Sequence, residues 1–151
     1  MARTELTNMC MICDETTGKV LAQRRVKSWK GVAFPGGKVE DGESIVDSTV
    51  REVKEETGLT VAALELCGIV HWHNGGTGDK YIVFCYRTSV FSGELLEQTD
   101  EGELFWTDRD ELASLPLAEG FGQRLPMFFD RAHSEGFGIW NVEGGNTMKW
   151  Q

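Results

Sequence analysis

Residues 37–59 read GKVEDGESIVDSTVREVKEETGL, and this stretch predicts a loop followed by a helix over residues 44–57. Gly58 comes after the helix, where a left-handed C-terminal cap belongs. On a helical wheel, one arc of roughly 140° forms the expected core-facing stripe. The residues in this stripe are Ile45, Val46, Thr49, Val50 and Val53. The stretch therefore predicts an amphipathic helix with glycines on both sides.

Three carboxylates lie beside the apolar stripe instead of opposite it. Glu52, Glu55 and Glu56 fall within about 100° of one another on the same wheel. Like charges this close repel unless a cation is bound or a proton is retained. Oxygen ligands suit magnesium or manganese, and magnesium commonly combines a few carboxylates with substrate phosphates. A solvated charged helix is the alternative, but it does not require the flanking glycines or an arginine among the glutamates.

The spacing of these residues resembles the Nudix box. Its pattern is Gly, five residues, Glu, seven residues, Arg-Glu, an apolar residue, any residue, Glu-Glu, any residue, Gly and an apolar residue. Every specified position is filled between Gly37 and Leu59. Nudix proteins hydrolyse nucleoside diphosphates linked to another group. The resemblance implies an α+β Nudix fold, with a mixed, curved β-sheet between helices in an α/β/α arrangement.

The resemblance also implies roles for the residues of the box. Gly37 would offer its backbone carbonyl to the metal, and Arg51 would pair with Glu43 and hold the catalytic glutamates in place. The metal ligands would be Glu52, Glu55 and Glu56, one of which could instead be the base that activates water. Which glutamate is the base stays open. The implied cofactor is Mg²⁺, with Mn²⁺ as a substitute.

Candidate residues outside the box are less specific. Glu101 resembles the acidic residue that many Nudix enzymes place before a late strand, as a further metal ligand or base, although acidic turns are common. The candidate phosphate contacts are Arg24, Arg25 and Lys38. The aromatic candidates for contact with a base are Trp29, Phe34, Trp72, Phe121 and Trp140, each of which equally suits a core position.

Within the family, the layout most resembles the MutT-like enzymes, which hydrolyse oxidised purine triphosphates such as 8-oxo-dGTP to a monophosphate and pyrophosphate. Such enzymes sanitise the nucleotide pool and so support DNA repair. The base-reading residues of those enzymes have no counterpart at Ala33 or in residues 117–121. Hydrolysis of ADP-ribose, nucleotide sugars or dinucleoside polyphosphates therefore stays open. A noncatalytic nucleotide sensor is the alternative of another class, against which the intact box argues.

Composition sets the remaining expectations. With 151 residues and 40% hydrophobic content, the chain fits a single domain over residues 1–151. The sequence has neither an apolar run of membrane-spanning length nor a signal-peptide pattern, so we expect a cytoplasmic protein. A formal charge of −9 argues against polymeric nucleic acid as a partner but allows a small nucleotide bound through a metal ion. We expect a monomer or a homodimer.

Periodicity and turn residues predict the other elements. Strands are expected over residues 6–13, 19–25, 61–72, 80–91 and 104–107, helices over 108–113 and 120–132, and a terminal hairpin over 137–150. The glycine-rich residues 73–79 predict a flexible loop beside the site. Cys10 and Cys13 form a Cys-x-x-Cys, which we interpret as small buried residues in a strand, with structural zinc or a redox role as the alternative.

Overall fold

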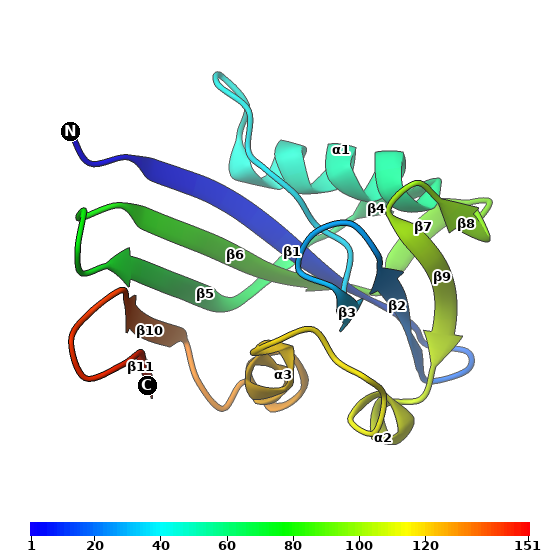
Figure 1. Cartoon of the computed structure of the whole chain (residues 1–151). Helices are drawn as coiled ribbons and strands as arrows, with labels where there is room; N and C mark the ends of the chain where they lie inside the picture. The colour runs from blue at the N-terminus through cyan, green and yellow to red at the C-terminus, as the bar shows by residue number, and fades with distance from the viewer.

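A computed structural model describes the whole chain, residues 1–151. The strands are β1 (Thr4–Asp14), β2 (Lys19–Arg25), β3 (Gly31–Ala33), β4 (Leu59–Ala62), β5 (Glu65–Asn74), β6 (Lys80–Thr88), β7 (Val90–Gly93), β8 (Gln98–Thr99), β9 (Gly102–Thr107), β10 (Glu135–Trp140) and β11 (Thr147–Trp150). The helices are α1 (Ile45–Thr57), α2 (Arg109–Leu112) and α3 (Phe121–Asp130). Helix α1 covers one face of the sheet, and α2 and α3 lie on the other (Figure 1). The expected α+β class and its α/β/α layering are confirmed.

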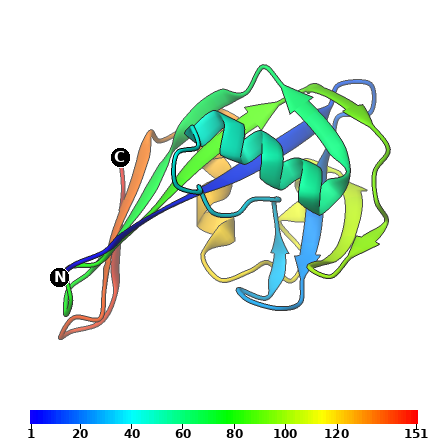
Figure 2. The same ribbon diagram turned by 90° about the horizontal axis from the view of Figure 1, so that it is seen from above.

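The main sheet is mixed, as expected. Its nine strands follow the order β11-β10-β5-β6-β1-β2-β9-β8, with β3 beside β2, and β4 and β7 form a separate pair. β1 runs parallel to β6 and β10 runs parallel to β5, whereas the other pairs are antiparallel. Figure 2 shows α1 lying across the sheet, with the long strands continuing past it toward both termini.

Strand β1 lies at the centre of two hydrophobic clusters, one on each face of the sheet. Met9 and Met11 join the cluster that includes residues of α3, whereas Cys10 and Ile12 join the cluster that includes residues of α1. Because both faces are covered, the apolar run of β1 is continuous instead of alternating. Cys10 is fully buried, all four cysteines are free thiols, and burial raises the pKa of the Cys10 thiol. The interpretation as a small buried residue is confirmed for Cys10, whereas Cys13 is only partly buried.

Two of the expected strands are each split in the structure. The strand expected over residues 61–72 breaks between β4 and β5, where Ala63 adopts a positive φ of 53°. The strand expected over residues 80–91 breaks between β6 and β7. Apolar residues continue on both sides of each break, so the sequence pattern conceals that β4 and β7 pair with each other outside the main sheet.

The other elements agree with expectation to within a few residues, which is the normal uncertainty of element ends. Hairpins β1–β2 and β10–β11 are present, although only the end of β1 pairs with β2. Helix α3 ends earlier than expected because Arg131 takes a left-handed conformation with φ of 50°. None of the helices has the length and apolar character needed to cross a membrane.

Helix α1 differs from the expected amphipathic pattern at one position. Val46 is 42% exposed, so it does not belong to the core-facing stripe, whereas Ser48 is fully buried. Ser48 Oγ accepts a hydrogen bond of 3.0 Å from Asn8 Nδ2 of β1 and donates one of 2.6 Å to the Ile45 carbonyl. A wheel that ranks residues by hydrophobicity assigns a serine to the solvent face and misses a polar contact with the sheet.

Candidate active site

The loop before α1 packs so closely on β1 and α1 that only glycine fits at two positions. A Cβ at Gly36 would collide with the backbone oxygen of Asn8, and a Cβ at Gly37 would collide with the carboxyl group of Glu52. The Gly37 amide donates to Asn8 Oδ1 at 3.0 Å, and the Gly37 carbonyl accepts from the Asn8 amide at 2.9 Å. Asn8 therefore holds the loop against the sheet, and through Ser48 it also holds α1.

Glu56 is the buried carboxylate of the box. It is 8% exposed and accepts a hydrogen bond of 3.1 Å from the Gly36 amide. Its pKa is raised to about 7, chiefly by burial; the Gly36 hydrogen bond and Arg25 lower the pKa, whereas the charges of Glu52 and Glu101 raise it. Glu101, which lies in another part of the sequence, is thus electrostatically part of the same site.

Arg51 is the centre of an ion-pair network on the outer side of α1. It donates to both carboxylate oxygens of Glu43, from Nε at 2.7 Å and from Nη2 at 3.0 Å, so the expected Arg51–Glu43 pair is confirmed. Nη1 reaches Glu52 at 3.1 Å and Glu55 at 3.2 Å, and Nη2 donates to the Lys38 carbonyl at 3.0 Å. This planar fork links the loop to two of the three carboxylates of the acidic arc, Glu52 and Glu55.

The three glutamates of α1 do not converge on one point, contrary to the wheel-based expectation. The side chain of Glu55 is 59% exposed and turns to Arg51, Glu52 also contacts Arg51, and Glu56 turns inward to Gly36. No group of three Asp, Glu, His or Cys side chains stands at distances suited to a shared metal ion. A helical wheel gives directions from the axis but not rotamers, and here Arg51 and the Gly36 amide attract the carboxylates to different sides.

The donor chemistry nevertheless fits a divalent cation. Burial raises the pKa of Glu52 as well as that of Glu56, and Arg51 partly offsets the effect at Glu52. Two largely buried carboxylates one helical turn apart, with Glu101 acting on Glu56, form a hard-oxygen environment with excess negative charge. The Gly37 carbonyl already accepts one hydrogen bond, which leaves one lone pair for a metal.

The three candidate phosphate contacts are placed very differently. Arg25 lines the pocket beside the box and contacts Trp29, with its guanidinium carbon 5.7 Å from the ring centroid. Arg24 projects from the other face of β2, near Glu103 and over Phe105, because successive strand residues point to opposite sides. Lys38 lies outside the pocket, and its exposed side chain pairs with Glu5 at 2.8 Å.

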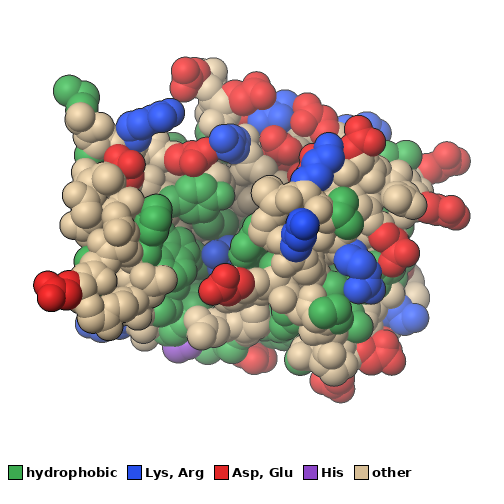
Figure 3. Space-filling model, viewed as in Figure 1, with side chains coloured by type: hydrophobic (Ala, Val, Ile, Leu, Met, Phe, Trp, Pro, Cys, Tyr) green, Lys and Arg blue, Asp and Glu red, His purple; other side chains and the backbone are tan.

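A pocket of about 690 Å³ adjoins the loop. Gly36, Gly37 and Arg25 line one part of it, and its walls are largely aromatic and apolar. The aromatic residues of the lining are Trp29, Phe34, Trp72, Tyr81 and Trp140. Figure 3 shows a hollow on this face, walled by hydrophobic side chains, with a basic side chain in its depth. Such a cavity suits a flat, partly polar ligand.

Two of the five expected aromatic residues belong mainly to the core. Phe34 has no exposed surface, although its residue borders the pocket, and its ring packs edge-to-face with Phe121 and Phe128 at centroid distances of 4.8 and 5.0 Å. Phe121 is also fully buried and does not line the pocket. The exposed edges of the cavity therefore come from the tryptophans and Tyr81.

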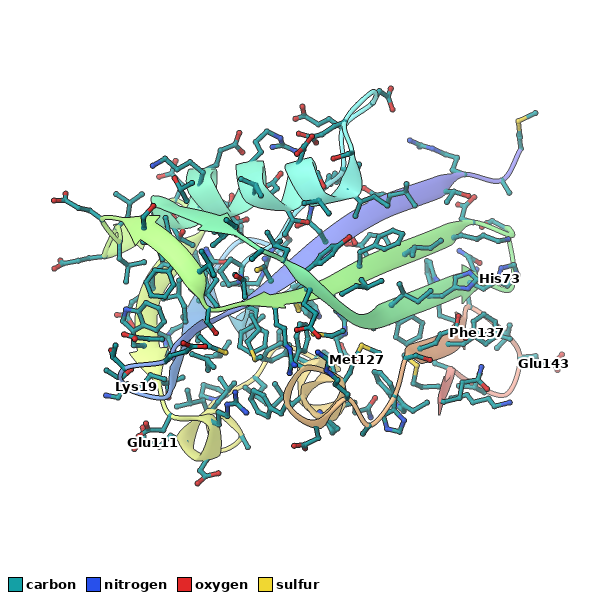
Figure 4. All side chains as sticks on the ribbon, turned by 180° about the vertical axis from the view of Figure 1, so that it is seen from behind. Lys19, His73, Glu111, Met127, Phe137 and Glu143 are labelled. Carbon is teal, nitrogen blue, oxygen red and sulfur yellow. The ribbon has the colours of Figure 1, made fainter.

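The glycine-rich connection after β5 is a hydrogen-bonded turn and does not line this pocket. Asn74 Oδ1 accepts from the amides of Gly76 and Thr77 at 2.9 and 3.1 Å, and from Asn141 Nδ2 at 2.9 Å. Figure 4 shows His73 at the end of the sheet where Glu143 and the β10–β11 turn also lie. The expected flexible loop is thus a hydrogen-bonded turn, whose own residues do not line the pocket although the neighbouring residues Trp72 and Tyr81 do.

Sequence reasoning missed Arg124 of α3, which lines the pocket and is 7% exposed. A signal was present in the sequence. Phe121, Leu125 and Phe128 form the buried stripe of this helix at helical spacing, and Arg124 occupies a position within the same stripe. A charged residue at a core position is unusual enough to mark a functional site.

The family assignment follows from comparison with known proteins. The NUDIX domain family matches residues 4–128, and the geometry above places the box of that family beside a pocket. The chain is a Nudix hydrolase. Nudix hydrolases are pyrophosphohydrolases that act on nucleoside diphosphate-linked substrates and generally use a divalent metal.

Relatives of this Nudix hydrolase carry different names. It is 32% identical over 114 residues to the Nudix hydrolase YvcI of Bacillus subtilis, covering 74% of this chain and 72% of YvcI. It is 33% identical over 132 residues to a Mycobacterium tuberculosis protein provisionally named 8-oxo-dGTP diphosphatase 3, covering 74% and 55%. It is 34% identical over 97 residues to the ADP-ribose pyrophosphatase of Methanocaldococcus jannaschii, covering 64% and 57%.

Among solved structures, the crystal structure of the mutator MutT protein from Bacillus halodurans is similar over nearly the whole chain. The TM-score is 0.75 with 28% identity, and the match covers 96% of this chain and 97% of the other. The resemblance to MutT proteins is thus confirmed at the level of the complete fold. The names of the sequence relatives span more than one substrate.

Proposed function

We propose that this Nudix hydrolase converts purine nucleoside triphosphates, including oxidised ones such as 8-oxo-dGTP, to the monophosphate and pyrophosphate. The observation that carries the proposal is that one pocket reaches from the box to a group of aromatic rings. Gly36, Gly37 and Arg25 border the pocket on the side of the box, and the aromatic rings lie along the rest of its wall. A nucleotide can then place its anhydride at the carboxylates and its base among the rings. The likeness to a MutT structure supports the same substrate class.

The proposed reaction is substitution at phosphorus by water. A water oxygen attacks phosphorus, the P–O bond of the anhydride breaks, and pyrophosphate leaves while one glutamate accepts the proton of the water. Bound Mg²⁺, or Mn²⁺ in its place, would neutralise phosphate charge. The side chains that would hold it with the Gly37 carbonyl are Glu52, Glu56 and Glu101, which would have to turn toward one point to do so. Arg51 orients Glu52 from outside, and Arg25 adds positive charge next to Glu56.

Two other functions compete with this proposal. Hydrolysis of ADP-ribose is favoured by the relative from Methanocaldococcus jannaschii, and nucleotide sugars or dinucleoside polyphosphates would use the same box. A nucleotide-binding sensor would bind without turnover. In the proposed role the protein acts on the free nucleotide pool, and its charge of −9 disfavours polymeric nucleic acid.

The test is product release from a substrate panel. Phosphate and pyrophosphate are measured with 8-oxo-dGTP, dGTP, dATP, ADP-ribose and a nucleotide sugar, each with magnesium and with chelator. Magnesium-dependent release of pyrophosphate from purine triphosphates is the expected result. Turnover of ADP-ribose or the nucleotide sugar alone would assign the enzyme a different substrate. Binding without turnover of any compound would support the role of a nucleotide sensor.

A further inference from the structure

Arg124 is a buried cation without an acceptor. Its side chain comes from α3 and is 7% exposed, yet no hydrogen bond or ion pair engages its guanidinium. Its guanidinium carbon lies 5.0 Å from the ring centroid of Trp29, a cation–π contact. Burial lowers its pKa. By contrast, Arg51 donates to the three carboxylates of Glu43, Glu52 and Glu55.

The guanidinium of Arg124 is largely but not completely enclosed, since the fully buried side-chain atoms without a partner belong to Gln23 and His71. Arginine carries five N–H donors and no acceptor, and removal of these donors from water without replacement bonds lowers stability. The ring of Trp29 offsets only part of this loss, because a cation–π contact gives the N–H donors no hydrogen-bond acceptor. The remaining donors border the pocket, so a ligand in the pocket can supply the acceptor.

Arg124 and Arg25 both lie over the ring of Trp29, with their guanidinium carbons 5.0 and 5.7 Å from its centroid, but they have different electrostatic partners. Arg25 affects the pKa of Glu56, whereas the groups that affect the pKa of Arg124 are Cys85 and Tyr81 of β6. The two arginines also come from different elements, Arg25 from the end of β2 and Arg124 from α3, on the face of the sheet opposite α1 (Figure 1). The anhydride belongs with the carboxylates and Arg25, which leaves Arg124 for the other end of the nucleotide.

We propose that Arg124 determines base specificity by donating to the 6-carbonyl oxygen of an oxopurine. This inference rests on the proposed function, since it takes a purine nucleotide as the ligand. A 6-oxopurine presents a carbonyl acceptor at this position, whereas adenine presents an amino group that would oppose donor to donor. The aromatic rings of the pocket suit a base, and Arg124 adds a second cation to a pocket that Arg25 also lines.

The experiment compares inosine and adenosine nucleotides, which differ at the 6-position and in the N1 proton that follows from it. Turnover of ITP and ATP and calorimetric binding of IMP and AMP are measured, with magnesium present, in the wild type and in Arg124→Met. In the wild type, the inosine compounds are preferred. In Arg124→Met, we expect kcat/KM for ITP and the affinity for IMP to fall roughly tenfold to hundredfold, with much smaller changes for ATP and AMP.

The control variant is Arg109→Met. Arg109 of α2 also lies over an aromatic ring, that of Phe129 at 5.0 Å, but it does not line the nucleotide pocket. Its substitution is expected to leave the ITP-to-ATP ratio unchanged. Thermal unfolding adds a readout that separates the roles: Arg124→Met is expected to unfold at the wild-type temperature or above it, because it removes an unpaired buried charge.

Each contrary outcome has a distinct meaning. Equal losses for inosine and adenosine compounds would overturn base reading and indicate a phosphate or sugar contact. A lower unfolding temperature with an unchanged ratio would indicate a structural role for the Trp29 contact and overturn the proposal. Preferential binding of IMP without hydrolysis of any triphosphate would overturn the proposed function and leave the role of Arg124 intact.

Discussion

Glu56 combines burial with a negative neighbourhood, and this combination explains why the folded protein resists its ionisation. The carboxylate is 8% exposed, it bonds to the Gly36 amide, and Glu52 and Glu101 act against its charge. A divalent cation would reverse this balance by adding positive charge where the carboxylates repel. At the residue scale, therefore, stability of the metal-free protein and activity of the metal-bound enzyme place opposite demands on Glu56.

Glu56→Gln is expected to lower kcat by roughly 100-fold or more, because the amide can neither hold a cation as strongly nor accept a proton. The fold should persist, since glutamine can still accept the Gly36 hydrogen bond. Steady-state pyrophosphate release with magnesium measures the effect. Glu111→Gln, on the exposed helix α2, serves as the control. Full activity of Glu56→Gln would contradict the assigned metal site.

The raised pKa of Glu56 also predicts a pH dependence of stability. Its pKa is about 7 when folded and 4.5 as the ordinary value, so the folded state holds the proton more tightly than the unfolded chain. This tighter proton binding stabilises the folded protein by roughly 3 kcal/mol below about pH 4.5. The stabilisation is lost as the pH rises through 7. Urea unfolding with chelator at pH 5 and pH 7.5 measures this loss. Glu56→Gln should lack it, and identical profiles for the two proteins would refute the assignment.

At the element scale, the site depends on how the glycine loop meets α1. The helix begins after Ser44, whose Oγ accepts from the Asp47 amide at 3.0 Å, and ends at Gly58, which has a φ of 83°. These caps hold the register of the helix and so determine which face Glu52 presents to the loop. Gly37 then contacts the Glu52 carboxylate so closely that no side chain fits between them.

Gly37→Ala is expected to displace the Glu52 carboxylate and to lower kcat/KM about 100-fold, the order of loss that follows from a misplaced catalytic group. Gly42→Ala provides the control in the same loop, since nothing lies within 4 Å of a Cβ at Gly42. Gly42 takes a positive φ of 79°, unlike Gly37, so Gly42→Ala introduces backbone strain in this loop without the collision. Comparable losses of kcat/KM in the two variants would show that a general disturbance of the loop backbone, and not displacement of the Glu52 carboxylate, causes the effect.

At the scale of the whole molecule, the sheet separates the two halves of the site. Helix α1 supplies the carboxylates from one face, and α3 supplies Arg124 from the other, with the loop at Gly36 and Gly37 bordering the pocket between them. A bound nucleotide would therefore contact both layers of the fold. Ligand binding is expected to stabilise the domain as one unit.

Magnesium with a nucleoside monophosphate should raise the unfolding free energy by about 2.7 kcal/mol when the nucleotide is present at about 100 times its Kd. Unfolding should stay a single transition, because the two layers share one sheet. Chelator should abolish the part of the gain that depends on the metal. Differential scanning calorimetry provides the measurement, and separate transitions for the two layers would contradict a shared site.

Local sequence was sufficient to predict the box, its helix and its arginine pair. The Arg51–Glu43 contact, the cap at Gly58 and the α/β/α layering all agree with expectation. These features depend on spacing along a single helix or on a family pattern that spans residues 37–59. Spacing of this kind sets which side chains share a face, whatever the remaining chain does.

Tertiary structure alone decided which of these groups meet. Arg24 and Arg25 are neighbours in sequence, yet only Arg25 reaches the pocket. The divergent directions of Glu55 and Glu56, the pairing of β4 with β7 and the unpaired burial of Arg124 likewise depend on contacts between distant segments. Sequence spacing determined which functional side chains the chain carries. Long-range packing determined how these side chains are oriented, because rotamers, strand pairing and burial are set by residues far away in the chain.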